Sequence, residues 1–133
     1  MKLPKVPKRK SIKALRKQLE DTVALYVKLR DKHTCQKCGK QVEGKNCQAS
    51  HVIPRSAGNQ FRYDPINLKV LCFHCHFNWW HKNPVKACEW FKEKFPDRYE
   101  YLFGQPSQIV KLDREWYESQ IEHYQQAVKI MEL

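Results

Sequence analysis

The sequence of this 133-residue chain predicts an α+β fold in which a small finger of two strands and a helix is flanked by further helices. Two Cys-x-x-Cys pairs are separated by 33 residues, and two short segments between them could form strands. Apolar residues also recur at steps of three and four before the first pair and after the second, as in amphipathic helices. The length suits one compact domain with extensions.

The N-terminal part is predicted to be a flexible basic arm, 1–10, followed by a basic helix, 11–32. The two prolines of the arm oppose a helix, and its like charges repel one another. Ser11 is a suitable N-cap, and the apolar residues behind it share one face. The residues of that face are Ile12, Leu15, Leu19, Val23, Tyr26 and Leu29.

The finger is predicted to occupy residues 33–83. Its first part, 33–47, contains two glycines and reads as a turn-rich knuckle. Segments 48–53 and 68–71 are predicted to be strands of a hairpin with a long connection. A helix should begin near Cys75 and close the unit.

The C-terminal part, 84–133, is predicted to be helical. An Asn-Pro pair at its start supplies an N-cap and a first helical residue, so we expect a helix over 84–95. Residues 99–103 should form a short turn. An apolar stripe predicts a last helix over 107–131.

Six cysteines in a chain without secretory features suggest metal ligands more than disulfides. Each Cys-x-x-Cys turn can deliver two thiolates to one tetrahedral ion, and four thiolates leave no open position, so we expect a structural zinc ion. Cys88 lies on an apolar helix face and should be core, while Cys47 could replace a ligand. The four predicted ligands are Cys35, Cys38, Cys72 and Cys75.

The formal net charge of the chain is +11, and residues 1–32 carry a net charge of +8. A concentrated basic end is typical of proteins that bind a polyanion, most often nucleic acid. A solvated tail that keeps the protein soluble would look the same. The candidate phosphate-binding residues of this end are Lys8, Arg9, Lys10, Lys13, Arg16 and Lys17.

No apolar run is long enough to span a membrane. The basic N-terminus is also not followed by the apolar core of a signal peptide. We therefore expect no membrane partner and a cytoplasmic, reducing location.

The order of the motifs resembles that of the HNH, or His-Me finger, endonuclease family, over roughly residues 20–83. The phage NinG/Rap recombination endonuclease group is the closest match, which would place the protein in a host cytoplasm. The group features are Arg30-Asp31 before the first cysteine pair, Ser50 before the histidine, and Arg62-Tyr63-Asp64 before the asparagine. The family motifs are Cys35-x-x-Cys38-Gly39, Ser50-His51-Val52-Ile53-Pro54, Asn67-Leu68 and Leu71-Cys72-x-x-Cys75-His76.

The resemblance implies a role for three residues in cutting a phosphodiester bond. His51 would be the general base that takes a proton from water, a task that suits a neutral imidazole. Asn67 would orient His51. His76 would bind a catalytic divalent ion such as Mg²⁺ or Mn²⁺ near the scissile phosphate.

The chain departs from the family at two positions. Many members have Asp before the base, where this chain has Ser50, so the ion needs a second ligand besides His76. His81 and Asn78 are the candidates, although His81 is about 140° from His76 on an ideal helix. A basic residue of the family is absent at Trp79, and Arg55 or Lys82 could neutralise a phosphate instead.

The motifs and the resemblance predict a metal-dependent DNA endonuclease. The resemblance to the NinG/Rap group suggests branched recombination intermediates as its substrate. The alternative is a non-catalytic zinc module that binds nucleic acid, and a weaker one is a protein adaptor. One of Trp79 and Trp80 should pack in the core, and the other could stack on a base. The sequence leaves dimerisation open.

Overall fold

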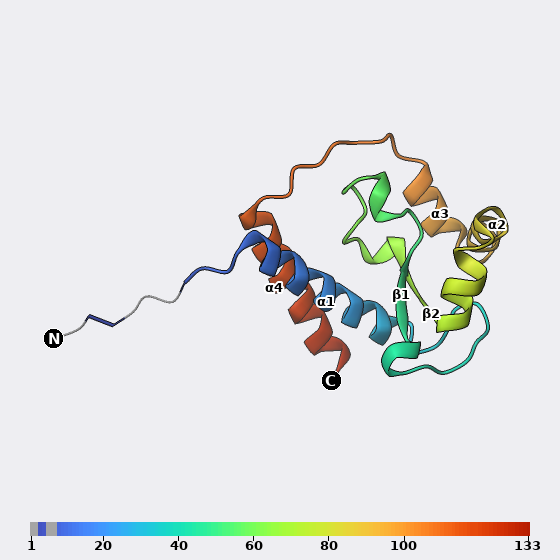
Figure 1. Cartoon of the computed structure of the whole chain (residues 1–133), viewed down its shortest axis with the longest axis horizontal. Coiled ribbons are helices and arrows are strands. Elements are labelled where there is room, and N and C mark those ends of the chain that lie inside the picture. The colour runs from blue at the N-terminus through green and yellow to red at the C-terminus, as the bar shows by residue number, and fades with distance from the viewer. Residues whose placement is uncertain (1–2, 5–7) are drawn as a thin grey trace.

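The computed structural model describes residues 3–4 and 8–133, so residues 1–2 and 5–7 of the predicted arm lie outside it. Two long helices lie side by side, and the sheet and shorter helices lie beyond them (Figure 1). Short 3-10 turns η1 (Gly44–Asn46), η2 (Arg55–Ala57) and η3 (Pro65–Asn67) occur in the connections. The main elements are α1 (Ile12–Arg30), β1 (Gln48–His51), β2 (Leu68–Leu71), η4 (His74–Trp80), α2 (Pro84–Lys94), α3 (Pro96–Phe103) and α4 (Arg114–Met131).

Helix α1 forms where the sequence predicts it. The Ser11 hydroxyl accepts a hydrogen bond from the Ala14 N–H at 3.1 Å and so caps the first turn. Its apolar face packs along α4, where the rings of Tyr26 and Tyr124 lie 5.6 Å apart. The buried residues of α1 are Leu15, Leu19, Val23 and Val27.

The predicted starts of the C-terminal elements need two corrections. Helix α4 begins at Arg114 and not at residue 107, because the Asp113 carboxylate caps it by accepting from the Trp116 N–H at 2.9 Å. The expected turn at 99–103 is part of α3, an eight-residue helix. Pro96 starts this helix, since its fixed φ suits the first helical position.

The two strands pair antiparallel, with Ser50 opposite Lys69 and His51 opposite Leu68. This confirms the predicted hairpin, although β1 ends at His51 and not at residue 53. Strand β2 is buried at every position, including Lys69. The Lys69 ammonium donates to the Ser50 hydroxyl at 3.0 Å and lies 3.2 Å from the centre of the Trp80 ring. Burial lowers the pKa of Lys69 well below its ordinary value, and the polar and π contacts offset part of the cost of burying this group.

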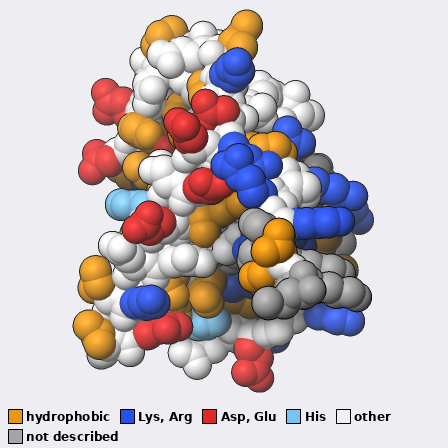
Figure 2. All heavy atoms as spheres, turned by 90° about the vertical axis from the view of Figure 1, so that its left-hand side faces the viewer, with side chains coloured by type: hydrophobic (Ala, Val, Ile, Leu, Met, Phe, Trp, Pro, Cys, Tyr) orange, Lys and Arg blue, Asp and Glu red, His pale blue; other side chains and the backbone are white. Residues whose placement is uncertain are grey.

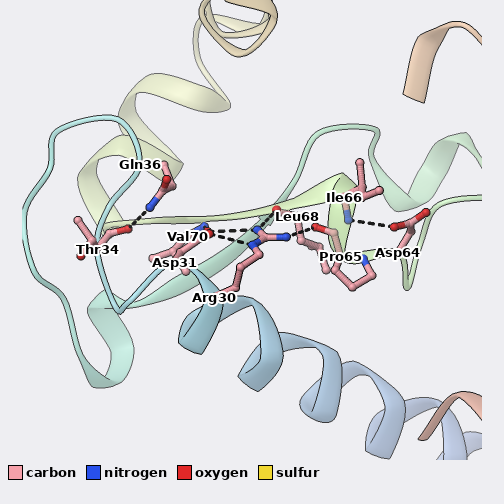
Figure 3. Close-up of polar contacts among 9 residues, drawn as sticks. All are labelled: Arg30, Asp31, Thr34, Gln36, Asp64, Pro65, Ile66, Leu68 and Val70. Atoms are coloured by element: carbon pink, nitrogen blue, oxygen red, sulfur yellow. Dashed lines mark hydrogen bonds and ion pairs between the residues drawn. The ribbon is translucent and has the colours of Figure 1, made fainter. Parts of the chain in front are cut away.

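An ion pair joins the end of α1 to the sheet (Figure 3). The Arg30 guanidinium donates to the carbonyls of Pro65 and Leu68, both at 2.7 Å. The Asp31 carboxylate accepts from Arg30 Nε and from the Val70 N–H, both at 2.9 Å. Charge-assisted bonds of this kind hold geometry well. The Arg-Asp pair therefore fixes the long helix against β2.

The helix predicted near Cys75 is present as η4, a wide helix of the π type. The His81 N–H donates to the His76 carbonyl at 3.1 Å, five residues back, where an α-helix would use the fourth. Residues five apart therefore lie on nearly one face. Within the described residues, no helix has the length and apolar character needed to cross a membrane.

Candidate functional site

Four cysteines meet between the knuckle and the start of η4. Their sulfur atoms lie within 4.8 Å of one another, and Cys38 Sγ and Cys72 Sγ are 3.9 Å apart. A tetrahedral zinc ion with Zn–S bonds of about 2.3 Å needs sulfurs about 3.8 Å apart. The cluster of Cys35, Cys38, Cys72 and Cys75 could therefore hold zinc with small adjustments.

The electrostatics of this cluster fit a bound cation. Burial disfavours the Cys35 thiolate, but backbone hydrogen bonds from Cys38, Cys72 and Lys37 outweigh burial and lower the pKa of Cys35 to about 7. Burial and the neighbouring thiols raise the pKa of Cys75. Four thiolates cannot share so small a volume without a cation between them. Among the described residues, Cys47 and Cys88 are not part of the cluster.

His51 lies at the end of β1 and lines an open cleft of about 790 Å³ together with His76 and His81. The His51 Nε2 atom is 2.9 Å from the Arg62 carbonyl oxygen. A carbonyl can only accept, so Nε2 carries the proton and Nδ1 keeps its lone pair. Burial lowers the pKa of His51, and the Arg62 carbonyl partly opposes this. The ring is therefore a neutral base above mildly acidic pH.

His76 and His81 meet at one point of the cleft, where their Nε2 atoms lie 3.0 Å apart. The Gln48 side-chain oxygen lies 3.3 Å from His76 Nδ1, which must therefore carry the proton and leave Nε2 with a lone pair. Burial, and then the nearby charges of His81, Lys69 and His51, lower the pKa of His76 to about 4. Two imidazoles whose Nε2 atoms converge fit a divalent metal ion.

The π-type helix explains why the angle expected from an ideal α-helix wrongly separates His81 from His76. On an ideal helix this residue would point away from His76, but η4 brings residues five apart onto one face. Asn78 instead contacts the His74 ring at 3.3 Å, and both are exposed.

Ser50 directly precedes His51 in β1 and is buried. Its hydroxyl accepts from Lys69 Nζ, and the same ammonium lies 3.3 Å from the His51 carbonyl. Strand β2 thus holds the backbone that carries His51.

Asn67 is completely buried and clamps the loop between the strands. Its amide oxygen accepts from the Ile53 N–H at 2.7 Å, and its amide nitrogen donates to the carbonyls of Ile53 and Phe61. These contacts reach the loop that carries the Arg62 carbonyl. The backbone of this loop thus connects Asn67 with the carbonyl that contacts the His51 ring.

The wall of the cleft contains an acid that sequence reasoning missed. Glu20 of α1 bonds through one carboxylate oxygen to Arg55 at 3.2 Å and to Arg62 at 3.3 Å. Lys82, the other candidate phosphate ligand, is exposed directly after His81. Nothing in the sequence around Glu20 separates it from the other charges of the helix.

The candidate residues at the basic end are exposed around the start of α1. Figure 2 views this end and shows most Lys and Arg side chains gathered on one side of the face. Lys10 Nζ donates to the Gln18 side chain at 2.7 Å, and Arg16 Nε lies 3.3 Å from the Tyr117 hydroxyl. Lys17 pairs with Asp21 at 2.7 Å. Lys8, Arg9 and Lys13 are also exposed.

No curated protein and no solved structure matches the chain significantly. A family model described as HNH endonuclease matches residues 35–78, about a third of the chain. This segment contains the cysteine cluster, both strands, His51 and His76. Its two strands, helix and four-cysteine cluster make the fold a ββα-metal finger of the HNH type flanked by helices, as the sequence predicts.

Proposed function

We propose that this protein is a metal-dependent DNA endonuclease in which His51 is the general base. The observation that carries the proposal is the convergence of three histidines in one cleft. The Nδ1 lone pair of His51 is available to accept a proton, and the Nε2 atoms of His76 and His81 lie 3.0 Å apart. The match of residues 35–78 to the HNH endonuclease model supports nucleic acid as the substrate.

His76 and His81 would hold the catalytic divalent ion, such as Mg²⁺ or Mn²⁺. When bound there, a divalent ion stabilises the charge that develops on the scissile phosphate and the leaving oxygen. Ser50 takes no part in this, because its hydroxyl is buried against Lys69. His81 would thus replace the acid that many family members place before the base.

His51 Nδ1 would take a proton from the attacking water while Nε2 stays bonded to the Arg62 carbonyl. Asn67 and Lys69 would hold the loop and strand that fix this imidazole. Arg55 and Lys82 would contact phosphates beside the cleft. The basic end around α1 would bind flanking phosphates without reading sequence.

Branched recombination intermediates are the substrate that we propose within this class. The resemblance to the NinG/Rap group supports them. Duplex, flap and four-way junction DNA cleaved in parallel would rank the three substrates. Equal rates on all three would remove this part of the proposal.

Plasmid nicking with Mg²⁺ or Mn²⁺ tests the activity itself. We expect His51→Ala to lower the rate by about 10²- to 10⁴-fold, the usual contribution of a general base. The matched control is His123→Ala, an exposed histidine on α4. Equal cleavage by wild type and His51→Ala would exclude His51 as the base. DNA binding without cleavage by any variant would favour a non-catalytic zinc module.

A further inference from the structure

Two phenylalanines of the finger are exposed beside the cleft. Phe73 is 54% exposed and Phe77 is 41% exposed. Their ring centres lie 4.7 Å apart, and the Phe77 ring lies 4.6 Å from the His76 ring. Phe77 also lines the cleft that contains the three histidines. An apolar pair at such a place needs a partner with an apolar face.

The tryptophans of the same helix do not offer such a face. Trp80 is buried, and the Lys69 ammonium covers its ring at 3.2 Å. Trp79 packs edge-on against Trp90 at 5.3 Å, with Lys37 over its ring. From the sequence we expect one tryptophan to stack on a base. The covered rings favour other aromatic residues of the finger for this role.

The phenylalanine pair is held in place by its surroundings. The Phe73 N–H donates to the Asn46 side chain at 2.9 Å, which ties the start of η4 to η1. The Phe77 ring contacts the rings of both Phe73 and His76. Because these contacts fix the Phe73 backbone and pack the Phe77 ring before binding, a partner would lose little extra entropy in ordering the pair.

The charges around the pair favour a polyanion. Lys45 is exposed in η1, next to the residue that bonds Phe73, and Lys82 is exposed directly after His81. A duplex presents phosphates on its outside and hides its base faces by stacking. Only an unpaired nucleotide brings a phosphate and an open base face to one place. The surroundings therefore fit unpaired DNA better than a protein partner.

We propose that Phe73 and Phe77 form a stacking platform for an unpaired base next to the scissile phosphate, so that the protein prefers DNA with single-stranded or branched character. This inference rests on the proposed nuclease function for the position of the phosphate. The binding preference itself does not depend on cleavage.

The test measures binding of fluorescent single-stranded, flap and duplex DNA without added divalent ions. We expect Phe77→Ala to weaken binding of single-stranded and flap DNA by about 5- to 150-fold, and duplex binding by less than twofold. Phe77→Trp should keep the preference. Phe103→Ala, at a 45% exposed phenylalanine on α3, is the matched control and should change nothing. Thermal melting of each variant verifies its fold.

A 2-aminopurine placed at the unpaired nucleotide should be quenched by wild type and not by Phe77→Ala. Equal losses on all DNAs, or no loss, would overturn the platform. So would a wild-type dimer that Phe77→Ala dissociates in sedimentation, because the pair would then be a self-association surface. A preference for unpaired DNA without any cleavage would support the stacking platform and contradict the nuclease proposal. Cleavage without a preference for unpaired DNA would support the nuclease and contradict the platform.

Discussion

The four cysteines lie within 4.8 Å of one another and three of them are buried, whereas the three histidines line an open cleft. The cysteines come from two short turns and would complete a tetrahedron by themselves. The histidines come from β1, from η4 and from the residue that follows η4, and the two nitrogens proposed as ligands would leave most positions around an ion free. A closed ligand set suits a structural ion, and an open one suits an ion that must also touch a substrate.

The sharpest way to break this comparison is to remove one sulfur. We expect Cys75→Ser to lose cooperative thermal unfolding and to lose the bound zinc, because zinc binding supplies folding free energy in small domains. Circular dichroism and metal analysis would measure both effects. Cys88→Ser, outside the cluster, is the control. A Cys75→Ser protein that stays folded without metal would contradict a structural role.

The open site should respond in the opposite way. His81→Ala should weaken Mn²⁺ binding by on the order of 100-fold, and Gln48→Ala by about tenfold, since second-sphere partners are worth about 10–100-fold. Neither change should alter zinc content or melting temperature. Calorimetric titration with Mn²⁺ measures the affinities. Unchanged Mn²⁺ affinity in His81→Ala would show that the paired nitrogens do not form the site.

The histidine cleft should also show a dependence on pH that comes from His51. Burial lowers the pKa of His51, so cleavage should rise about tenfold per pH unit below that pKa and level off before about pH 6.5. The unfolded chain protonates this histidine at a higher pH than the folded chain. Its contribution to stability is therefore present above about pH 6.5 and is lost as the pH falls through the folded pKa. A rate profile that turns above this pH would contradict the assignment.

The smallest effect concerns Glu20. Its carboxylate pairs with Arg55 and Arg62 at the wall of the cleft and competes there with phosphate. Glu20→Gln should tighten DNA binding by about three- to tenfold at low salt, with the gain fading at high salt. Glu122→Gln, exposed on α4, is the control for net charge. An equal gain in both variants would show that only the total charge matters.

The elements with strong local signals could be predicted. Ser11 and the apolar stripe behind it define α1, and the two cysteine pairs define the cluster. The strands follow from their place between those pairs.

The parts that depend on distant contacts could not be predicted. The link from Arg62 to His51 needs the folded loop. The start of α4 was mispredicted for a local reason, because the N-cap Asp113 competed with an earlier apolar pattern. The burial of Lys69 depends on Ser50 and Trp80 together.

The wide turn of η4 also bears on how this region tolerates change in length. Each of its i→i+5 hydrogen bonds spans one residue more than a bond of an α-helix, and this brings His76 and His81 together. Residues four apart share a face in an α-helix. Deletion of a single residue between these histidines would thus preserve their juxtaposition while relaxing the backbone into a commoner conformation. Homologous fingers with a shorter segment here could carry the same pair of imidazoles.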